Sequence, residues 1–458
     1  MKKKIMKQFL YKSLLLLGVV YGTACNKMLN TQPTQSIDQT VALNTSSDVL
    51  VALTGAYADM GVENAYGGLT FVAPDLLGNF AELNWSGTYQ GMTQIYNKTI
   101  PIDNNFTTQN WLTSYTAIND VNNVLSALNV VTADKKASVE GQAKFIRGSL
   151  YFDLVRLFAR AWNDGDPTAN DGVPLVLTPT GGITDANKVS RNKVSEVYAQ
   201  VISDLTDAES LLPATNGFYA NKAAASAMLA RVYLQKGDYP NAAAAANRAI
   251  TTATANGFAL TSTYAAAFPA PYPPAAVANT SEDLFAMQVT PTSGFNTFNE
   301  YYSPYSRGDI QINQAHLNLY EPGDARLGLF YNSGGSIYTA KFDNVYGNVH
   351  IIRLAEMYLT RAEANFRMGT QVGDAPVNDI NKIRQRVNLL PYTAGTLTLA
   401  AILKERKLEL AFEGFTLHDV KRTQGTVGNL NYNSSKLVFP IPKREIIVNP
   451  NLTQNAGY

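Results

Sequence analysis

Residues 229–249 read LARVYLQKGDYPNAAAAANRA, and the fold class can be worked out from this stretch. Apolar residues, most of them small, occur at helical spacing on both sides of a short turn, Gly237-Asp238-Tyr239. They are Leu229, Ala230, Tyr233, Ala242 and Ala249. Small side chains let two helices approach closely, and the ring of Tyr233 fills the gap that remains between them. The stretch therefore predicts two helices that pack against each other.

The spacing in this stretch is that of a tetratricopeptide repeat. Leu354-Ala355-x-x-Tyr358, followed by Ala362, Ala364 and Gly369, repeats the core of the pattern, and Gly148-x-x-Tyr151 is a fainter copy. Repeats of this kind bury their apolar faces on their neighbours. The sequence therefore predicts a stack of helix pairs.

Amphipathic periodicity extends this expectation over most of the chain. It predicts helices over residues 46–60, 111–128, 139–161, 195–212, 222–235, 240–255, 350–368, 376–387 and 398–413. The segments between them, at 61–110, 162–190, 256–349 and 423–445, are predicted to be loops, with short strands near 284–289 and 336–342. A connection as long as residues 256–349 is unusual inside a compact stack. We therefore expect a mainly α fold whose helical scaffold carries a loop-rich subdomain.

Composition limits the classes of ligand. The chain has 458 residues, of which 46% are hydrophobic and only 16% charged, so its polar surface depends on amides, hydroxyls and 25 tyrosines. Residues 1–24 contain five lysines and no acid, and their removal changes the formal charge from +1 to −4. Such a surface suits neutral polar ligands and argues against nucleic acid.

The N-terminus has the pattern of an export signal. Lysines precede an apolar run at residues 13–21, which is too short to span a bilayer, and small residues lead to Cys25, the only cysteine. We expect a signal peptide at 1–24, a lipidated N-terminus and tether at 25–45, and a folded domain at 46–458. Gly22 stands where a lipoprotein signal prefers Leu, so an ordinary secretory signal is the alternative.

Specific motifs lie in the last third of the chain. They are IIRLAEMYL (351–359), RAEA (361–364), INKIRQR (380–386), ERKLELAFEG (405–414), DVKR (419–422), FPIP (439–442) and NPNL (449–452). Together with Trp111-x-x-x-Tyr115, Gly172-Val173-Pro174 and Asp324-Ala325-Arg326, they resemble the SusD/RagB family of outer-membrane nutrient-binding lipoproteins.

This resemblance implies four tetratricopeptide-like helix pairs and a loop-rich binding region. It also implies a lipid-anchored protein on the surface of the outer membrane. Such a protein captures glycans and delivers them to a SusC-like TonB-dependent transporter. A RagB-like member that binds peptides is the alternative within the family. Members are not enzymes, and no cofactor is expected.

Two loops combine the groups that bind neutral sugars, which are aromatic faces and amide or guanidinium donors. The first loop, 79–97, offers Asn79, Asn84, Trp85, Tyr89 and Tyr96; the second, 294–311, offers Tyr301, Tyr302, Tyr305 and Arg307. We predict that these residues contact the ligand. The alternative is that part of the aromatic set only fixes the loops to the scaffold.

Two other patterns have competing interpretations, and one further functional class stays open. Glu405, Glu409 and Glu413 lie on one helix face, where they either supply a glycosidase acid and base or, as we expect, form a structural ion network. The acids of segment 164–171 permit a calcium site, although a solvated turn is the default. A pure interaction scaffold is the third functional class, because tetratricopeptide stacks usually bind proteins.

Overall fold

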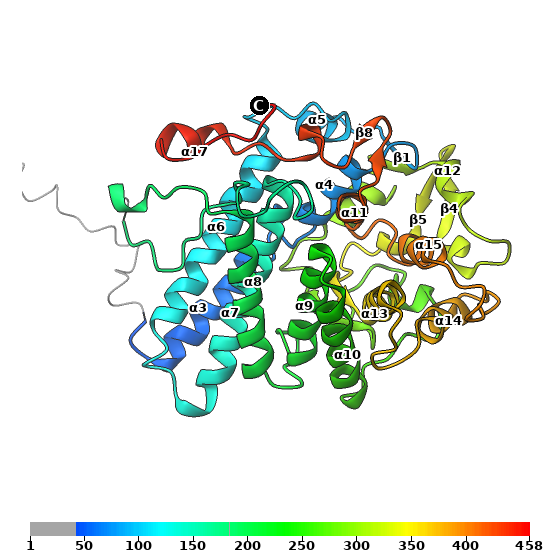
Figure 1. The fold of residues 1–458 in the computed structure, drawn as a ribbon, viewed down its shortest axis with the longest axis horizontal. Helices are drawn as coiled ribbons and strands as arrows, with labels where there is room; N and C mark the ends of the chain where they lie inside the picture. The colour runs from blue at the N-terminus through cyan, green and yellow to red at the C-terminus, as the bar shows by residue number, and fades with distance from the viewer. Residues whose placement is uncertain (1–42, 183) are drawn as a thin grey trace, which may run out of the picture.

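The computed structural model describes residues 43–182 and 184–458, and its long helices pack against one another in chain order (Figure 1). The series is α3 (Ser46–Met60), α6 (Asn105–Ser126), α7 (Ala133–Phe158), α8 (Val194–Leu211), α9 (Lys222–Lys236), α10 (Tyr239–Ala255), α13 (Leu354–Met368) and α14 (Pro376–Arg386). Within the described residues these helices form four successive pairs. The predicted mainly α stack is confirmed.

The pair α9–α10 shows why the sequence folds in this way. Gly237 ends α9 in the left-handed region at a φ of 75°, and the Asp238 side chain caps the first turn of α10 by accepting from the Asn241 amide. Alanines on both helices are fully buried, so the two axes lie close together. A similar close approach occurs at Gly148 of α7, where an added Cβ would lie 3.0 Å from Leu205 Cγ of α8.

The loop-rich region is built around short antiparallel strands. One sheet has the order β1 (Leu83–Trp85), β3 (Ile310–Ile312), β5 (Ser336–Thr339) and β4 (Phe330–Ser333). A second sheet pairs β2 (Asp283–Met287) with β6 (Val349–Arg353), and β7 (Thr426–Val427) pairs with β8 (Leu430–Asn431). Residues 256–349 are therefore tied by strand pairing to segments on both sides of them.

Shorter helices complete the fold and correct several predicted boundaries. They are α4 (Leu69–Gly78), α5 (Gln90–Tyr96), α11 (Thr297–Tyr302), α12 (Gln314–Leu317), α15 (Leu399–Glu409), α16 (Thr416–Arg422) and α17 (Lys443–Val448). Short 3-10 turns lie at Asp185–Asn187, Ala265–Ala267, Ala325–Leu329, Ala340–Phe342 and Ser435–Leu437.

Three expectations about the elements were wrong. The segment 61–110 contains α4 and α5, and α4 escaped detection because it is buried on every side and contains Pro74. The predicted helix 350–368 begins as strand β6, whose β-branched Val349, Ile351 and Ile352 favour extended backbone. The helix predicted to reach residue 413 ends at Glu409, before Phe412 and Gly414 adopt positive φ.

The predicted signal peptide, Cys25 and most of the tether lie outside the described residues. Over residues 43–182 and 184–458, no helix combines the length and apolar character required to cross a membrane.

Candidate ligand-binding surface

Strand pairing brings the two predicted ligand loops together. Asn84 of β1 lies opposite Gln311 of β3, and its amide donates to the Gln311 side-chain oxygen at 3.0 Å. Two residues further on, the Ser86 amide donates to the Asp309 carbonyl at 2.8 Å. The loops 79–97 and 294–311, far apart in sequence, therefore form one continuous surface.

Three exposed side chains of these loops combine aromatic faces with a guanidinium, and we call them the paired-loop surface: Tyr89, Tyr305 and Arg307. Tyr89 is 40% exposed and Tyr305 is 79% exposed. The guanidinium carbon of Arg307 lies 3.8 Å from the centre of the Tyr89 ring. Arg307 Nε also donates to Asp309 Oδ2 at 2.7 Å, so the guanidinium is held from two sides.

The Arg307 guanidinium keeps its positive charge in this environment. Partial burial disfavours the cation, but the hydrogen bond and charge of Asp309 outweigh it and raise the pKa of Arg307. Glu300 lies 4.0 Å from Arg307 Nε, and burial together with the charge of Glu63 raises the pKa of Glu300. The surface therefore offers aromatic faces and fixed guanidinium donors next to a carboxylate.

The other predicted aromatic residues form the floor of this surface. Trp85 is buried, and its Nε1 donates to Thr93 Oγ1 at 2.8 Å. Tyr301 is buried between Trp85 and Tyr89, with ring centres 5.7 and 6.3 Å away. Tyr302 lies deeper, against Phe342 and Phe412. These rings fix the loops and present no open face to solvent.

Asn79 and Tyr96 shape the first loop. The Asn79 side-chain oxygen accepts from the Glu82 and Leu83 amides at 2.9 and 3.1 Å. The Tyr96 hydroxyl donates to the Leu83 carbonyl at 3.3 Å. Both side chains therefore position β1, through the Asn79 side-chain oxygen and the Tyr96 hydroxyl.

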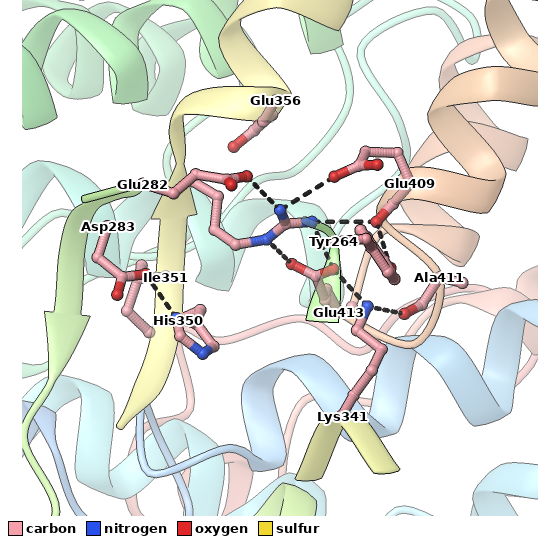
Figure 2. Close-up of polar contacts among 12 residues, drawn as sticks. Tyr264, Glu282, Asp283, Lys341, His350, Ile351, Glu356, Glu409, Ala411 and Glu413 are labelled. Carbon is pink, nitrogen blue, oxygen red and sulfur yellow. Dashed lines mark hydrogen bonds and ion pairs between the residues drawn. The ribbon is translucent and has the colours of Figure 1, made fainter. Parts of the chain in front are cut away.

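The glutamates of α15 and the turn after it belong to a buried ion network. Figure 2 shows Glu282, Glu409 and Glu413 converging from different elements. Arg353 joins them: its Nε donates to Glu413 at 2.7 Å and its Nη1 to Glu409 at 3.1 Å. Lys341 donates to Glu413 at 2.6 Å (Figure 2).

Glu405 continues the network on the far side, 2.6 Å from Arg326. Burial alone would raise the pKa of the Glu413 carboxyl, but Arg353 and Lys341 hold it at about 2. The three carboxylates are thus buried and ion-paired, as the structural interpretation requires, and none faces a cleft where a glycosidic bond could sit.

The acids considered for calcium are engaged elsewhere. Asp164 accepts from Arg160, Asp166 from Thr168, and Asp171 from Lys193. Across the described residues, no group of three or more His, Cys, Asp or Glu side chains is arranged to hold a metal ion.

Sequence reasoning missed a second feature, a hollow of about 800 Å³ between α3 and β2. Phe218, Tyr219 and Phe295 line it, and all three are exposed. Phe218 and Tyr219 follow Asn216-Gly217 in the turn before α9, and an aromatic pair placed in a polar turn is the signal that could have revealed it.

Comparison with known proteins agrees with the fold. A family model described as "Starch-binding associating with outer membrane" matches residues 28–234, and one described as the SusD family matches residues 338–436. SusD-like protein P2 of Formosa agariphila is 26% identical over 90% of this chain and 93% of its own length. The starch-binding protein SusD of Bacteroides thetaiotaomicron is 35% identical over 24% of this chain and 22% of its own.

Solved structures extend the likeness to three dimensions. A Bacteroides vulgatus protein solved as a candidate sugar-binding protein has a TM-score of 0.82 and 29% identity, over 91% of this chain and 99% of its own. The two family models cover different parts of the chain, and the structural likeness spans nearly all of it. The chain therefore belongs to the SusD/RagB family.

Proposed function

We propose that this protein captures neutral glycans on the paired-loop surface without turning them over. The observation that carries the proposal is the exposed Tyr89–Arg307 stack above a buried aromatic floor, with the exposed Tyr305 two residues before Arg307 in the same loop. Aromatic faces pack on the C–H-rich faces of sugar rings, and guanidinium donors bond to ring hydroxyls. The family model that matches residues 28–234 carries a starch-binding description, which supports the same chemistry.

The proposal includes a cellular setting. The protein is anchored to the outer membrane through a lipid on Cys25 and passes its ligand to a SusC-like TonB-dependent transporter. The sequence pattern before Cys25 and the outer-membrane description of the matching family model support the anchor. The transporter follows from the family resemblance, and a peptide-binding RagB-like role is the competing assignment.

Binding is tested with residues 26–458 against a panel of neutral glycans, including starch and β-glucans, and a peptide pool. We expect saturable binding of one glycan class and no appearance of new reducing ends. Tyr305→Ala, Tyr89→Ala and Arg307→Ala should each weaken binding about tenfold, the effect of losing about 1.4 kcal/mol of contact energy. Calorimetry and affinity electrophoresis measure the change.

Leu390→Ala is the matched control, because Leu390 is 83% exposed and lies outside the paired-loop surface. Its affinity should equal that of the wild type. Full affinity in all three surface variants would show that the glycan binds elsewhere. Binding of peptides alone would replace glycan capture by the RagB-like alternative.

A further inference from the structure

The hollow between α3 and β2 continues into a second one. A space of about 280 Å³ lies on the other side of the turn before α9, and it is lined by polar residues such as Asn256, Asn279 and Ser281. Phe218, Tyr219 and Phe285 line both spaces. The turn 217–219 is thus an aromatic ridge between two hollows, which we call the ridge surface.

The turn 217–219 is held in place by α3, while the Phe218 ring stays exposed to solvent. The Tyr57 ring of α3 lies 4.9 Å from the Tyr219 ring, and the Tyr57 hydroxyl accepts from the Ala220 amide at 3.1 Å. Phe218 is nevertheless 59% exposed, and Phe295 across the larger hollow is 49% exposed. A fixed turn with open aromatic faces is preorganised for a ligand that stacks, because little flexibility is lost on binding.

The lining of the ridge surface indicates a neutral ligand. Among the described residues that line the two hollows, none is Lys or Arg. The acids are Asp59 and Asp283, and Asp283 already accepts from Thr280 and pairs with His350 at 2.5 Å. The remaining polar groups are side-chain amides and hydroxyls. This set cannot neutralise phosphate or carboxylate groups, but it matches a hydroxyl-rich, uncharged chain.

The ridge surface adjoins the paired-loop surface. Phe295 precedes α11 and Tyr301 lies near its end, and a helix of six residues is only about 9 Å long. Val62 lines the larger hollow. Burial is the main cause that raises the pKa of Glu300 and of Tyr301, and the charge of Glu63, the residue after Val62, adds to both shifts. One elongated ligand can therefore reach both surfaces by crossing α11.

We propose that the ridge surface is a second binding site for a neutral glycan, which holds the outer part of a long chain whose other part lies on the paired-loop surface. This proposal rests on the function proposed above. The volume of the larger hollow, about 800 Å³, lies within the range of about 300–1,000 Å³ typical of ligand sites. The ridge surface makes affinity depend on glycan length, because a second contact on the same chain acts at high effective concentration.

The test compares short and long ligands. Starch-derived and laminarin-derived oligosaccharides, each as the trisaccharide and as the longest soluble member, are titrated into wild type, Phe218→Ala and Phe295→Ala. We expect both variants to bind the long member about tenfold more weakly than the wild type and the trisaccharide about equally well. Phe218→Tyr should keep full affinity because it keeps a stacking face. Leu390→Ala and the thermal midpoints of all variants control for folding.

Each outcome has a distinct meaning. The wild type is tested against both series as oligosaccharides and as immobilised polysaccharides. If it binds none of them, the result contradicts both the proposed function and this second site. Wild type that binds, with unchanged long-chain affinity in Phe218→Ala and Phe295→Ala, overturns only the second site. A peptide pool that binds wild type but not Phe218→Ala, with no effect on glycan affinity, would assign the ridge surface to peptides and overturn the proposal.

Discussion

At the scale of single residues, Arg353 has the most crowded polar environment described above. Its guanidinium contacts the carboxylates of Glu282, Glu409 and Glu413 in the interior. These residues come from the segment just before β2, from the end of β6, from α15 and from the turn after α15. Removing one partner leaves an uncompensated charge, which typically costs about 3–5 kcal/mol. The network therefore fixes how these segments meet.

Glu413→Gln tests this network. The folded-state pKa of about 2 lies below the ordinary value of 4.5, so the contribution of Glu413 to stability is complete above pH 4.5 and is lost as the pH falls toward 2. We expect Glu413→Gln to lower the free energy of unfolding by about 3 kcal/mol at neutral pH and to flatten its decline in that acid window. Urea unfolding at several pH values measures both effects.

The control is Asp185→Asn, which removes an exposed carboxylate paired with Lys188. Exposed pairs contribute less than about 1 kcal/mol, so this variant should unfold like the wild type. Equal stability of Glu413→Gln and Asp185→Asn would show that the buried network contributes nothing measurable.

The sequence could indicate which loops carry aromatic residues, but not which rings face solvent. Tyr301, Tyr302 and Tyr305 occupy the same polar segment, yet the first two lie in α11 beneath the loops and the third lies after it. The difference depends on the pairing of β1 with β3, a contact between distant segments that no local pattern encodes. Trp85 shows the same limit, since its ring packs near Tyr301 and is buried, which its place in a polar loop does not reveal.

At the scale of elements, α4 and α16 fit closely against each other. Asp75 of α4 accepts from the Gly414 amide and the Thr416 hydroxyl, both at 2.8 Å. A Cβ added at Gly78 would lie 2.6 Å from Leu417 Cα, which is backbone and cannot rotate away.

Sequence periodicity predicted the amphipathic helices well but missed α4, because a helix that is buried on all sides shows no polar face.

Gly78→Ala tests this junction. We expect it to lower the free energy of unfolding by about 1–3 kcal/mol, since α4 and α16 must move apart. Gly55→Ala in α3 is the matched control: nothing lies within 4 Å of its added Cβ, so it should instead stabilise by about 0.5–1 kcal/mol. Denaturant midpoints of the two variants should shift in opposite directions, and a parallel shift would contradict the packing argument.

At the scale of the whole molecule, the described domain and the proposed anchor have separate roles. No helix in the described residues could cross a membrane, and we propose that the lipid on Cys25 provides the attachment. Acyl chains add about 0.8 kcal/mol per buried CH₂, so several chains anchor a protein firmly. Attachment should therefore depend on the N-terminus and glycan binding on the folded domain.

Cys25→Ser in the full chain tests this separation. We expect the variant to leave the membrane fraction and to incorporate no labelled palmitate, while it binds glycan with the affinity of the wild type. Cell fractionation and labelling measure the first effect, and calorimetry the second. Leu390→Ala should stay in the membrane fraction. Retention of Cys25→Ser there would mean that another feature holds the protein to the membrane.

The pairing of β1 with β3 also determines when the binding surface can exist. Asn84 and Gln311 are 227 positions apart along the chain, whereas α9 and α10 are neighbours joined by a short turn. Contacts between distant segments form late in folding, because closing a long loop costs conformational entropy before the contact contributes any stabilising free energy. The helical stack can therefore assemble from local hairpins first. We therefore expect the chain to acquire its ability to hold a ligand only after the local helix pairs have formed, because that ability depends on the pairing of β1 with β3.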